Sequence, residues 1–256
     1  MDHPTDRDLT ETGPKAEDLR VKIFADGADL EAIRELASNP VIQGFTTNPT
    51  LMRKAGVTDY EEFARQALEL VGDRPISFEV FTDDFAEMAR EARILAELGE
   101  SVYVKIPVTD TSGNSAADLV SELSAEGIKL NVTGLFTQNQ VKAISAVLDD
   151  DTPACISLFA GRIADAGIDP VPHVASAVQA IADKPNQELI WASPREVLNV
   201  VQAHETGCHI ITVTPDILKK LPSLGKDLTQ FSLETVQMFN TDALDAGYAL
   251  RARSRA

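Results

Sequence analysis

Short apolar runs alternate with longer amphipathic stretches from about residue 21 to residue 250. The runs are rich in β-branched residues, as strands buried on both faces are, whereas the longer stretches place apolar residues at helical spacing. Eight strands are predicted, at residues 21–26, 44–48, 76–80, 102–106, 129–133, 154–159, 188–193 and 209–214. The predicted helices between them include 29–38, 59–71, 84–98, 138–148, 172–182 and 195–204, several of which begin at a Ser, Thr or Asp cap.

This regular alternation predicts a parallel sheet built from repeated βα units. Eight strands favour a single (β/α)8 TIM barrel over an open doubly wound sheet, because no glycine-rich phosphate fingerprint follows the first strand. We predict a polar tail over residues 1–20 and one barrel domain over residues 21–256. Helical patterns at 216–221 and 227–247 add a C-terminal helical extension, expected to pack on a neighbouring subunit or over the barrel mouth.

The chain has 256 residues, of which 44% are hydrophobic, and a formal net charge of −17. So much negative charge repels nucleic-acid backbones and anionic membrane surfaces, so neither is an expected partner. We find no apolar stretch suited to a signal peptide or a membrane span, which predicts a cytoplasmic protein. Cys155 and Cys208 lie in apolar runs and are expected to be reduced core thiols, and the four histidines show no metal-ligand spacing, so we predict no metal.

Nearly every predicted strand carries a polar residue at its carboxyl end, where (β/α)8 barrels build their active sites. Lys105 is the most informative, because it lies in the otherwise apolar run 102–108. It either has a chemical role or is a strand-end lysine that extends its amine to water. Glu79, Lys105, Asn131 and Ser157 follow one another at intervals of 26 residues, which predicts equivalent heights on adjacent strands.

These residues can be given chemical roles. A buried lysine amine can be partly neutral near pH 7 and attack a ketose carbonyl to form a Schiff base, after which a neighbouring carbon–carbon bond breaks and leaves an enamine. Asp26 is the candidate base, since it closes an apolar strand, and a cap or turn before Gly27 is its alternative. Glu79 is predicted to orient a water molecule with Thr133 as hydroxyl partner, or alternatively to form only an ion pair with Lys105.

Two amides are candidates for holding the sugar. Asn48 and Asn131 offer donors and acceptors that could bind the hydroxyls of a three-carbon fragment. Asn48 stands before Pro49, which is also a plain turn signal, so both interpretations stay open for this residue.

Two arginines suit the far end of the substrate. Arg162 and Arg195 follow strand ends, and Arg195 stands near Ser193, so together they offer forked and hydroxyl donors for a phosphate. The alternative for Arg162 is a surface salt bridge with Asp165. The alternative for Arg195 is an exposed position in the first turn of a helix.

Taken in order, these segments resemble the transaldolase family of class I Schiff-base enzymes on a (β/α)8 barrel. The resemblance runs from about Ile23 to the end of the chain and is carried by Phe24 to Asp26, Gly44 to Thr50, Phe78 to Val80, Val104 to Ile106, Leu130 to Thr133, Ser157 to Arg162 and Ala192 to Arg195. It implies that Lys105 forms the Schiff base, that Asp26 is the acid/base, and that Glu79 and Thr133 hold the catalytic water. The substrate-binding residues that it implies are Thr47, Asn48, Asn131, Ser157 and Phe159, with Arg162, Ser193 and Arg195 at the phosphate.

The family's usual reaction moves a dihydroxyacetone unit from a ketose phosphate, such as fructose 6-phosphate or sedoheptulose 7-phosphate, to an aldose phosphate such as erythrose 4-phosphate. We therefore expect a transferase of carbohydrate metabolism, in the pentose phosphate pathway or a specialised sugar or polysaccharide pathway, that needs no cofactor.

The family also contains fructose-6-phosphate aldolases, which release dihydroxyacetone. These aldolases resemble the present chain less, because they have glutamine where it has Glu79 and tyrosine where it has Phe159. Leu158 departs from the proline common in longer members. A sugar-phosphate binder without turnover is the least favoured alternative, and a homo-oligomer stays open.

Overall fold

The computed structural model describes residues 12–248. The chain forms two compact units, one of which is Arg20–Lys220. The other combines the segment before Arg20 with the segment from Leu221 onward. The predicted tail and domain limits extend into residues 1–11 and 249–256, which lie outside the described part.

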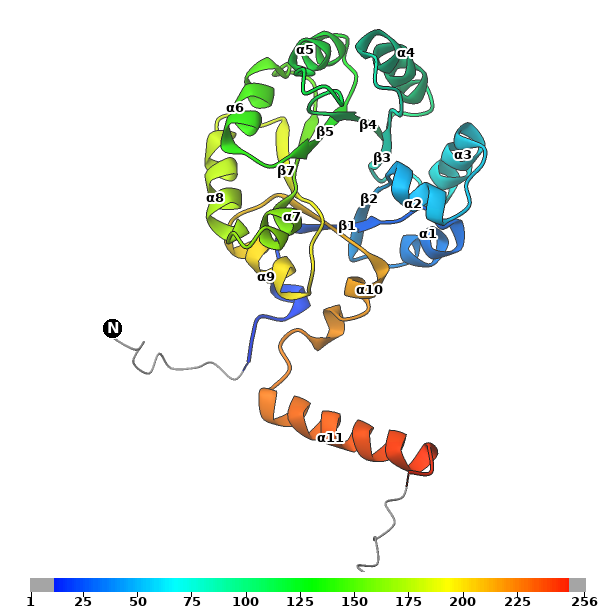
Figure 1. The fold of residues 1–256 in the computed structure, drawn as a ribbon, viewed down its shortest axis with the longest axis vertical. Helices are drawn as coiled ribbons and strands as arrows, with labels where there is room; N and C mark the ends of the chain where they lie inside the picture. Colours follow the sequence, from blue (N-terminus) through cyan, green and yellow to red (C-terminus); the bar gives the residue numbers. More distant parts are fainter. Residues whose placement is uncertain (1–11, 249–256) are drawn as a thin grey trace, which may run out of the picture. The chain divides into compact units, whose positions relative to one another are not determined.

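Eight parallel strands close into a barrel in the order of the sequence, which confirms the predicted fold class (Figure 1). They are β1 (Lys22–Asp26), β2 (Ile42–Thr46), β3 (Ile76–Glu79), β4 (Val102–Pro107), β5 (Leu130–Leu135), β6 (Ala154–Leu158), β7 (Gln187–Trp191) and β8 (Ile210–Val213). The second strand begins and ends two residues earlier than predicted, and its earlier end leaves Asn48 free to cap a helix that starts at Pro49.

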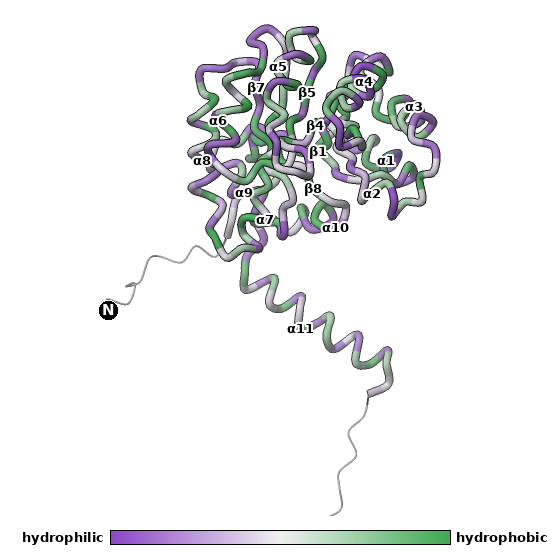
Figure 2. Tube along the Cα trace, turned by 45° about the horizontal axis from the view of Figure 1, so that its top comes forward, coloured by the Kyte–Doolittle hydropathy of each residue, from purple (hydrophilic) through white to green (hydrophobic). Residues whose placement is uncertain are grey.

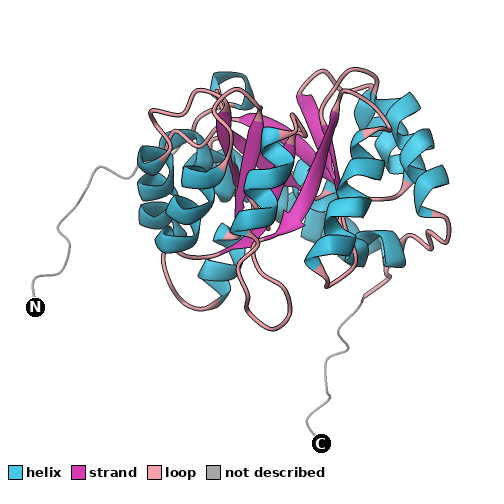
Figure 3. Cartoon of the chain, turned by 90° about the horizontal axis from the view of Figure 1, so that it is seen from above, coloured by secondary structure: helices cyan, strands magenta, loops and turns pink. Residues whose placement is uncertain are grey.

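The barrel is surrounded by helices, which Figure 3 shows outside the strands. They are α1 (Leu30–Ala37), α2 (Pro49–Lys54), α3 (Tyr60–Val71), α4 (Phe85–Ala96), α5 (Ala117–Ala125), α6 (Gln138–Val147), α7 (Ala160–Asp165), α8 (Pro170–Ala180), α9 (Leu198–Glu205) and α10 (Pro215–Leu218). The side chains of Asp29, Asp59, Asp84 and Thr137 cap four of them by accepting hydrogen bonds from first-turn amides. Apolar and polar residues alternate along the outer helices, as expected when one face packs on the barrel (Figure 2).

Side chains that point into the barrel form layers along its axis. Near the amino ends of the strands, Lys22 and Glu188 form an ion pair of 2.8 Å. Above them lies an apolar plug of Phe24, Cys155, Ile190 and Ile210, against which Tyr103 packs. Gly44 leaves room for this plug, since a Cβ atom there would lie 2.4 Å from the Phe24 ring. Above the plug the inward side chains are polar again, at the carboxyl ends of the strands, where (β/α)8 barrels build their active sites.

Both cysteines behave as the sequence predicts. Cys155 and Cys208 are free thiols and both are buried. Burial raises the pKa of both thiols, that of Cys208 to about 12, which disfavours the thiolate.

In its described residues, the second unit has two short 3-10 turns, η1 (Ala16–Asp18) and η2 (Leu221–Ser223), and one long helix, α11 (Leu228–Asp245). The α11 helix buries none of its residues, and Leu228, Phe231, Val236 and Phe239 are exposed on it. Within residues 12–248, no helix has the length and hydropathy needed to cross a membrane.

Candidate active site

Lys105 lies at the centre of the polar layer. Its side chain is only 8% exposed, and its Nζ lies 3.0 Å from Glu79 Oε2 on the neighbouring strand β3. It also donates a 2.8 Å hydrogen bond to the carbonyl oxygen of Thr47, at the end of β2. The amine therefore does not extend to water, which rules out the strand-end interpretation, and the ion pair considered for Glu79 is present.

Asp26 ends β1 and turns toward this centre. Its Oδ1 accepts a 2.8 Å hydrogen bond from the Thr46 hydroxyl, while Asp29 caps the following helix, so Asp26 is not the cap. Burial raises the pKa of the Asp26 carboxyl above its usual 3.8 and outweighs the opposing effects of the Lys105 ammonium and the Thr46 hydrogen bond. The nearby Glu79 carboxylate raises it further. This combination is typical of a carboxyl group that exchanges protons during a reaction.

Asn131 and Ser157 are joined beside Lys105. Ser157 Oγ donates to Asn131 Oδ1 at 2.7 Å, and Asn131 Nδ2 donates to the Ser77 hydroxyl at 3.0 Å. All three residues are almost fully buried. This chain of hydrogen bonds fixes the orientation of the Asn131 amide and leaves one of its N–H groups for a ligand.

The prediction of equivalent heights was correct for two of its three steps. Glu79 pairs with Lys105 and Lys105 pairs with Asn131. Asn131, however, pairs with Cys155, so Ser157 lies two residues further along β6. Equal spacing in the sequence counts loop residues as well as strand residues, and a shorter connection before β6 shifts its register.

Thr47 and Asn48 both form hydrogen bonds within the protein that occupy some of the groups predicted to bind the substrate. The Thr47 hydroxyl donates to the Ser77 carbonyl oxygen at 2.9 Å, and Thr47 is fully buried. Its carbonyl oxygen, and not its hydroxyl, contacts Lys105. Asn48 Oδ1 accepts from the Leu51 amide at 3.0 Å as the cap of α2, so its turn interpretation is confirmed and its amide hydrogens remain as donors.

Thr133 is buried on β5, next to a break in the strand register. The pairing with β6 shifts between Val132 and Leu135, and Gly134 has a φ of 79°, a conformation that favours glycine. Thr133 pairs with Pro107 of β4, two residues beyond Lys105. Among the described residues, no hydrogen bond joins the side chains of Thr133 and Glu79.

Two aromatic rings and one arginine lie together beyond the ends of β5 and β6. The Phe159 ring stacks on the Phe136 ring with their centres 5.7 Å apart, and the Arg162 guanidinium lies 5.6 Å from the centre of the Phe159 ring. Arg162 is exposed. The ion pair with Asp165 that was the alternative for Arg162 is not made by this residue.

Asp165 pairs with Arg195 instead. Arg195 Nε lies 3.0 Å from Asp165 Oδ1, and its NH2 group contacts the second carboxylate oxygen. Arg195 is not in the first turn of α9, because that helix begins only at Leu198. It lies in the preceding loop, where its amide donates a 2.7 Å hydrogen bond to the Asn199 side chain. The alternative for Arg195 was therefore right about exposure and wrong about position.

The loops that carry these arginines meet at Gly161. A Cβ atom on Gly161 would lie 1.5 Å from the Ser193 carbonyl oxygen, so only glycine allows this approach. Ser193 has a φ of 60°, the only non-glycine residue with a positive φ in the described part. The strained serine and the glycine together bring the loop after β7 against the start of α7, where Arg162 lies.

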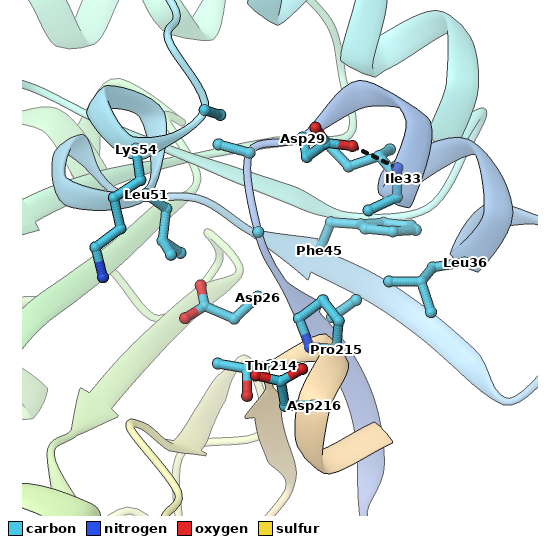
Figure 4. Close-up of a pocket in the computed structure, with 15 residues that line it drawn as sticks. Asp26, Asp29, Ile33, Leu36, Phe45, Leu51, Lys54, Thr214, Pro215 and Asp216 are labelled. Carbon is cyan, nitrogen blue, oxygen red and sulfur yellow. Dashed lines mark hydrogen bonds between the residues drawn. The ribbon is translucent and has the colours of Figure 1, made fainter. Parts of the chain in front are cut away.

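A cavity opens beside Asp26. It has a volume of about 440 Å³ and lies among the ends of β1 and β2 and the helices α1, α2 and α10. Apolar residues of these elements make up much of its wall, and Asp29, Lys54 and Asp216 add charge. Figure 4 shows the Lys54 side chain extended toward the side on which the Asp26 carboxyl group lies.

Sequence reasoning assigned no role to three residues of this layer. Thr46 donates to Asp26, Thr212 of β8 forms a hydrogen bond with Thr46, and Ser77 supports Asn131. Their common signal is a polar residue at an inward position of a buried strand. Ser77 precedes Glu79 by two residues, as Asn131 precedes Thr133, so the two-residue strand period would have found it.

Comparison with solved structures supports the fold alone. A structure titled "Crystal structure of 2,3-dimethylmalate lyase, a PEP mutase/isocitrate lyase superfamily member, triclinic crystal form" superposes with a TM-score of 0.52 and 13% identity. The superposition covers 94% of this chain and 89% of the other.

Sequence comparison is more specific. A family model described as "Transaldolase/Fructose-6-phosphate aldolase" matches residues 23–252. A "Probable transaldolase" of Thermoanaerobacter sp. is 39% identical over 202 residues, which cover 78% of this chain and 89% of that relative. A second, from Chelativorans sp., is 38% identical over 216 residues, which cover 82% and 94% of the two chains. The chain therefore belongs to the Transaldolase/Fructose-6-phosphate aldolase family.

Proposed function

We propose that the protein transfers a dihydroxyacetone unit from a ketose phosphate to an aldose phosphate through a Schiff base on Lys105. The observation that carries this proposal is the buried Lys105 amine, 3.0 Å from the Glu79 carboxylate, in the same layer as the Asp26 carboxyl. A nucleophile, a proton acceptor beside it and a second carboxyl group are the parts that a class I aldol reaction needs.

The first step frees the amine. The Glu79 carboxylate accepts a proton from the Lys105 ammonium, which yields a neutral amine and a neutral carboxylic acid. The amine adds to the ketose carbonyl, and Glu79 returns the proton, through a water molecule that Thr133 helps to hold, to the hydroxyl that leaves as water. The hydrogen bond from Lys105 to the Thr47 carbonyl oxygen, 2.8 Å long, keeps the amine aimed during these transfers.

The second step breaks a carbon–carbon bond. The Asp26 carboxylate takes the proton of the C4 hydroxyl, the bond between C3 and C4 breaks, and its electron pair moves toward the iminium nitrogen. An aldose phosphate leaves, and an enamine of three carbons stays on Lys105. The enamine then attacks the aldehyde carbon of the acceptor, Asp26 returns its proton to the new hydroxyl, and water releases the product.

Amide and hydroxyl groups hold the three-carbon unit. Asn131 and Ser157 keep donor and acceptor capacity beyond the hydrogen bond that joins them, and the Asn48 amide hydrogens are free of its capping contact. Fixed groups of this kind bind the sugar hydroxyls without reordering, which lowers the cost of reaching the reactive geometry.

Arg195, with Arg162 and Ser193, is proposed to bind the substrate phosphate. Replacing Arg195 with alanine should raise KM for fructose 6-phosphate by about 10- to 100-fold, because a charge-assisted contact to the phosphate is lost. Turnover of fructose, the same ketose without its phosphate, should change less than about threefold. Steady-state kinetics with both donors checks this.

Arg93→Ala is the matched control for that variant. Arg93 also pairs with carboxylates, those of Glu122 and Glu126, but belongs to α4, which carries no residue of the proposed site. An equal loss with both donors in Arg195→Ala, or an equal KM effect in Arg93→Ala, would remove Arg195 from the phosphate site.

Release of free dihydroxyacetone is the alternative function. Phe159 favours transfer, because its ring has no proton to give to the enamine, whereas a tyrosine hydroxyl there could protonate the enamine and free the unit. The Phe159 ring stacks on the Phe136 ring, which has no hydroxyl either.

The double variant Glu79→Gln with Phe159→Tyr should therefore shift the reaction toward release. We expect the ratio of free dihydroxyacetone to transfer product to rise about tenfold or more. The two products are quantified in one reaction by mass spectrometry. Phe136→Tyr, which adds a hydroxyl to the neighbouring ring, is the control and should keep the wild-type ratio; an unchanged ratio in the double variant refutes this assignment.

The function is tested with purified protein, fructose 6-phosphate and erythrose 4-phosphate. Formation of sedoheptulose 7-phosphate faster than free dihydroxyacetone supports a transferase, and the reverse supports an aldolase. A panel of other ketose and aldose phosphates then decides between the pentose phosphate pathway and a specialised sugar pathway. Absence of any product across the panel contradicts the proposed activity.

A further inference from the structure

Two buried threonines connect Asp26 to the strands on either side of β1. Thr46 lies on β2 opposite Asp26, and Thr212 lies on β8 opposite Phe24, so both flank β1. Thr46 Oγ1 lies 2.8 Å from Asp26 Oδ1, and the two threonine hydroxyls form a hydrogen bond with each other. Thr46 is 3% and Thr212 6% exposed, so water competes little for these hydroxyls.

The direction of these hydrogen bonds follows from the number of protons. A threonine hydroxyl has one proton to donate and can accept at its oxygen. While Asp26 is ionised, Thr46 gives its proton to the carboxylate and can only accept from Thr212. The order is therefore Thr212 to Thr46 to Asp26.

Protonation of Asp26 reverses the order. The Asp26 hydroxyl then donates to Thr46, and Thr46 donates to Thr212, while every heavy atom keeps its place and only two hydroxyl rotors turn. A single threonine beside Asp26 could donate to the carboxylate and accept from the acid, but in the second state its own proton would lack an acceptor. Thr212 supplies that acceptor to Thr46, and in the first state it supplies a donor.

We propose that Thr212 is a positioning residue that, acting through Thr46, holds Asp26 in one orientation in both of its protonation states. The proposal rests on the proposed function, in which Asp26 is a base during cleavage and an acid during addition. A carboxyl group that changes its role within each cycle needs a support that fits both forms, because a side chain that rotates after each transfer misplaces the proton for the next one.

Other charges also face Asp26. Lys105 and Glu79 act on it from β4 and β3, and Lys54 of α2 and Asp29 and Asp216 at α1 and α10 line the adjoining cavity. These groups stay in place when Thr212 alone is changed. The hydrogen bond from Thr46 lowers the pKa of Asp26, and Thr212 strengthens that donor by donating its own proton to the Thr46 oxygen.

Thr212→Val tests the proposal, because valine keeps the shape and removes the hydroxyl. We expect kcat to fall by about three- to tenfold with KM for the donor nearly unchanged. The acidic limb of the kcat/KM profile should move to higher pH, since Asp26 then holds its proton more tightly. Thr212→Ser, which restores the hydroxyl, should recover both the rate and the profile.

Thr152→Val is the matched control. Thr152 is a threonine of similar burial, 7% exposed, whose hydroxyl donates to the Ser124 carbonyl oxygen at 2.9 Å far from this layer. It should lower stability without changing the pH profile. If Thr212→Val does not fold by circular dichroism, Thr212→Ala with Thr212→Ser as its rescue makes the same comparison.

A Thr212→Val variant with wild-type kcat and pH profile overturns the proposal, as does a loss of kcat that serine does not recover. Borohydride trapping of the wild type separates this failure from failure of the proposed function. If the wild type forms the Lys105 adduct and transfers the unit, only the role of Thr212 falls. If it forms neither, the proposed function falls first, and this proposal falls with it.

Discussion

Replacing Lys105 with methionine is expected to abolish covalent trapping of the donor by borohydride and to lower kcat/KM by about 10⁴-fold or more, because no amine is left to form the Schiff base. Methionine fills a similar volume in the buried layer. The measurement combines steady-state transfer kinetics with intact mass after reduction in the presence of fructose 6-phosphate.

Loss of the lysine also leaves Glu79 without its cation, and a buried charge without a partner destabilises a fold. The double variant Lys105→Met with Glu79→Gln removes both charges and separates the two effects. It should unfold at a denaturant concentration near that of the wild type and still form no adduct. A folded Lys105→Met protein that is still trapped would show that another lysine carries the chemistry.

Lys22 offers a matched control for this experiment. It is also paired with a glutamate across the barrel, Glu188 at 2.8 Å, but lies at the amino end of β1, below the apolar plug. Lys22→Met should keep the adduct and most of the activity. A comparable loss in both variants would point to general disruption of the barrel.

Replacing Asp26 with asparagine is expected to lower kcat by about 10²- to 10⁴-fold, since proton transfer at the C4 hydroxyl is lost while the hydrogen bond from Thr46 can be kept. The adduct on Lys105 should still form, because Schiff-base formation relies on Glu79. Asp216→Asn, an exposed carboxylate on the same cavity, is the control and should retain activity.

The Asp26→Asn variant should be more stable than the wild type near neutral pH. Burial raises the pKa of Asp26 above its usual 3.8, so the folded protein binds a proton more tightly there than the unfolded chain does. The resulting cost to wild-type stability is absent below 3.8, grows as pH rises from 3.8 through the folded pKa, and is constant above it. Urea unfolding across this window should show Asp26→Asn gaining on the wild type as pH rises. A gain at low pH that vanishes on raising the pH would contradict the sign of this shift.

The sequence predicted the barrel because its signals are local. Each strand is a β-branched run of its own, and each cap, such as Asp29 or Asp84, acts within one turn of helix. The polar residues at strand ends needed only the further rule that these ends meet on one face of a barrel. For Lys105 and Glu79, which are register partners on adjacent strands, this was enough to predict equivalent heights, while their ion pair was only the alternative interpretation of Glu79.

What the sequence could not predict depends on distant partners. Thr46 and Thr212 meet across 166 residues, and neither stands out in its own segment. Asp165 could have paired with Arg162 three residues before it, but pairs with Arg195, because the close approach at Gly161 brings the β7 loop to it. The choice among partners is set by how loops cross, which spacing along the chain does not encode.

The most direct test of the account is borohydride reduction of the wild-type protein with fructose 6-phosphate, followed by peptide mapping, with and without erythrose 4-phosphate. The account predicts a three-carbon adduct on Lys105 that the acceptor diminishes as sedoheptulose 7-phosphate forms. An adduct on another lysine, or sedoheptulose 7-phosphate formed without any adduct, would contradict it.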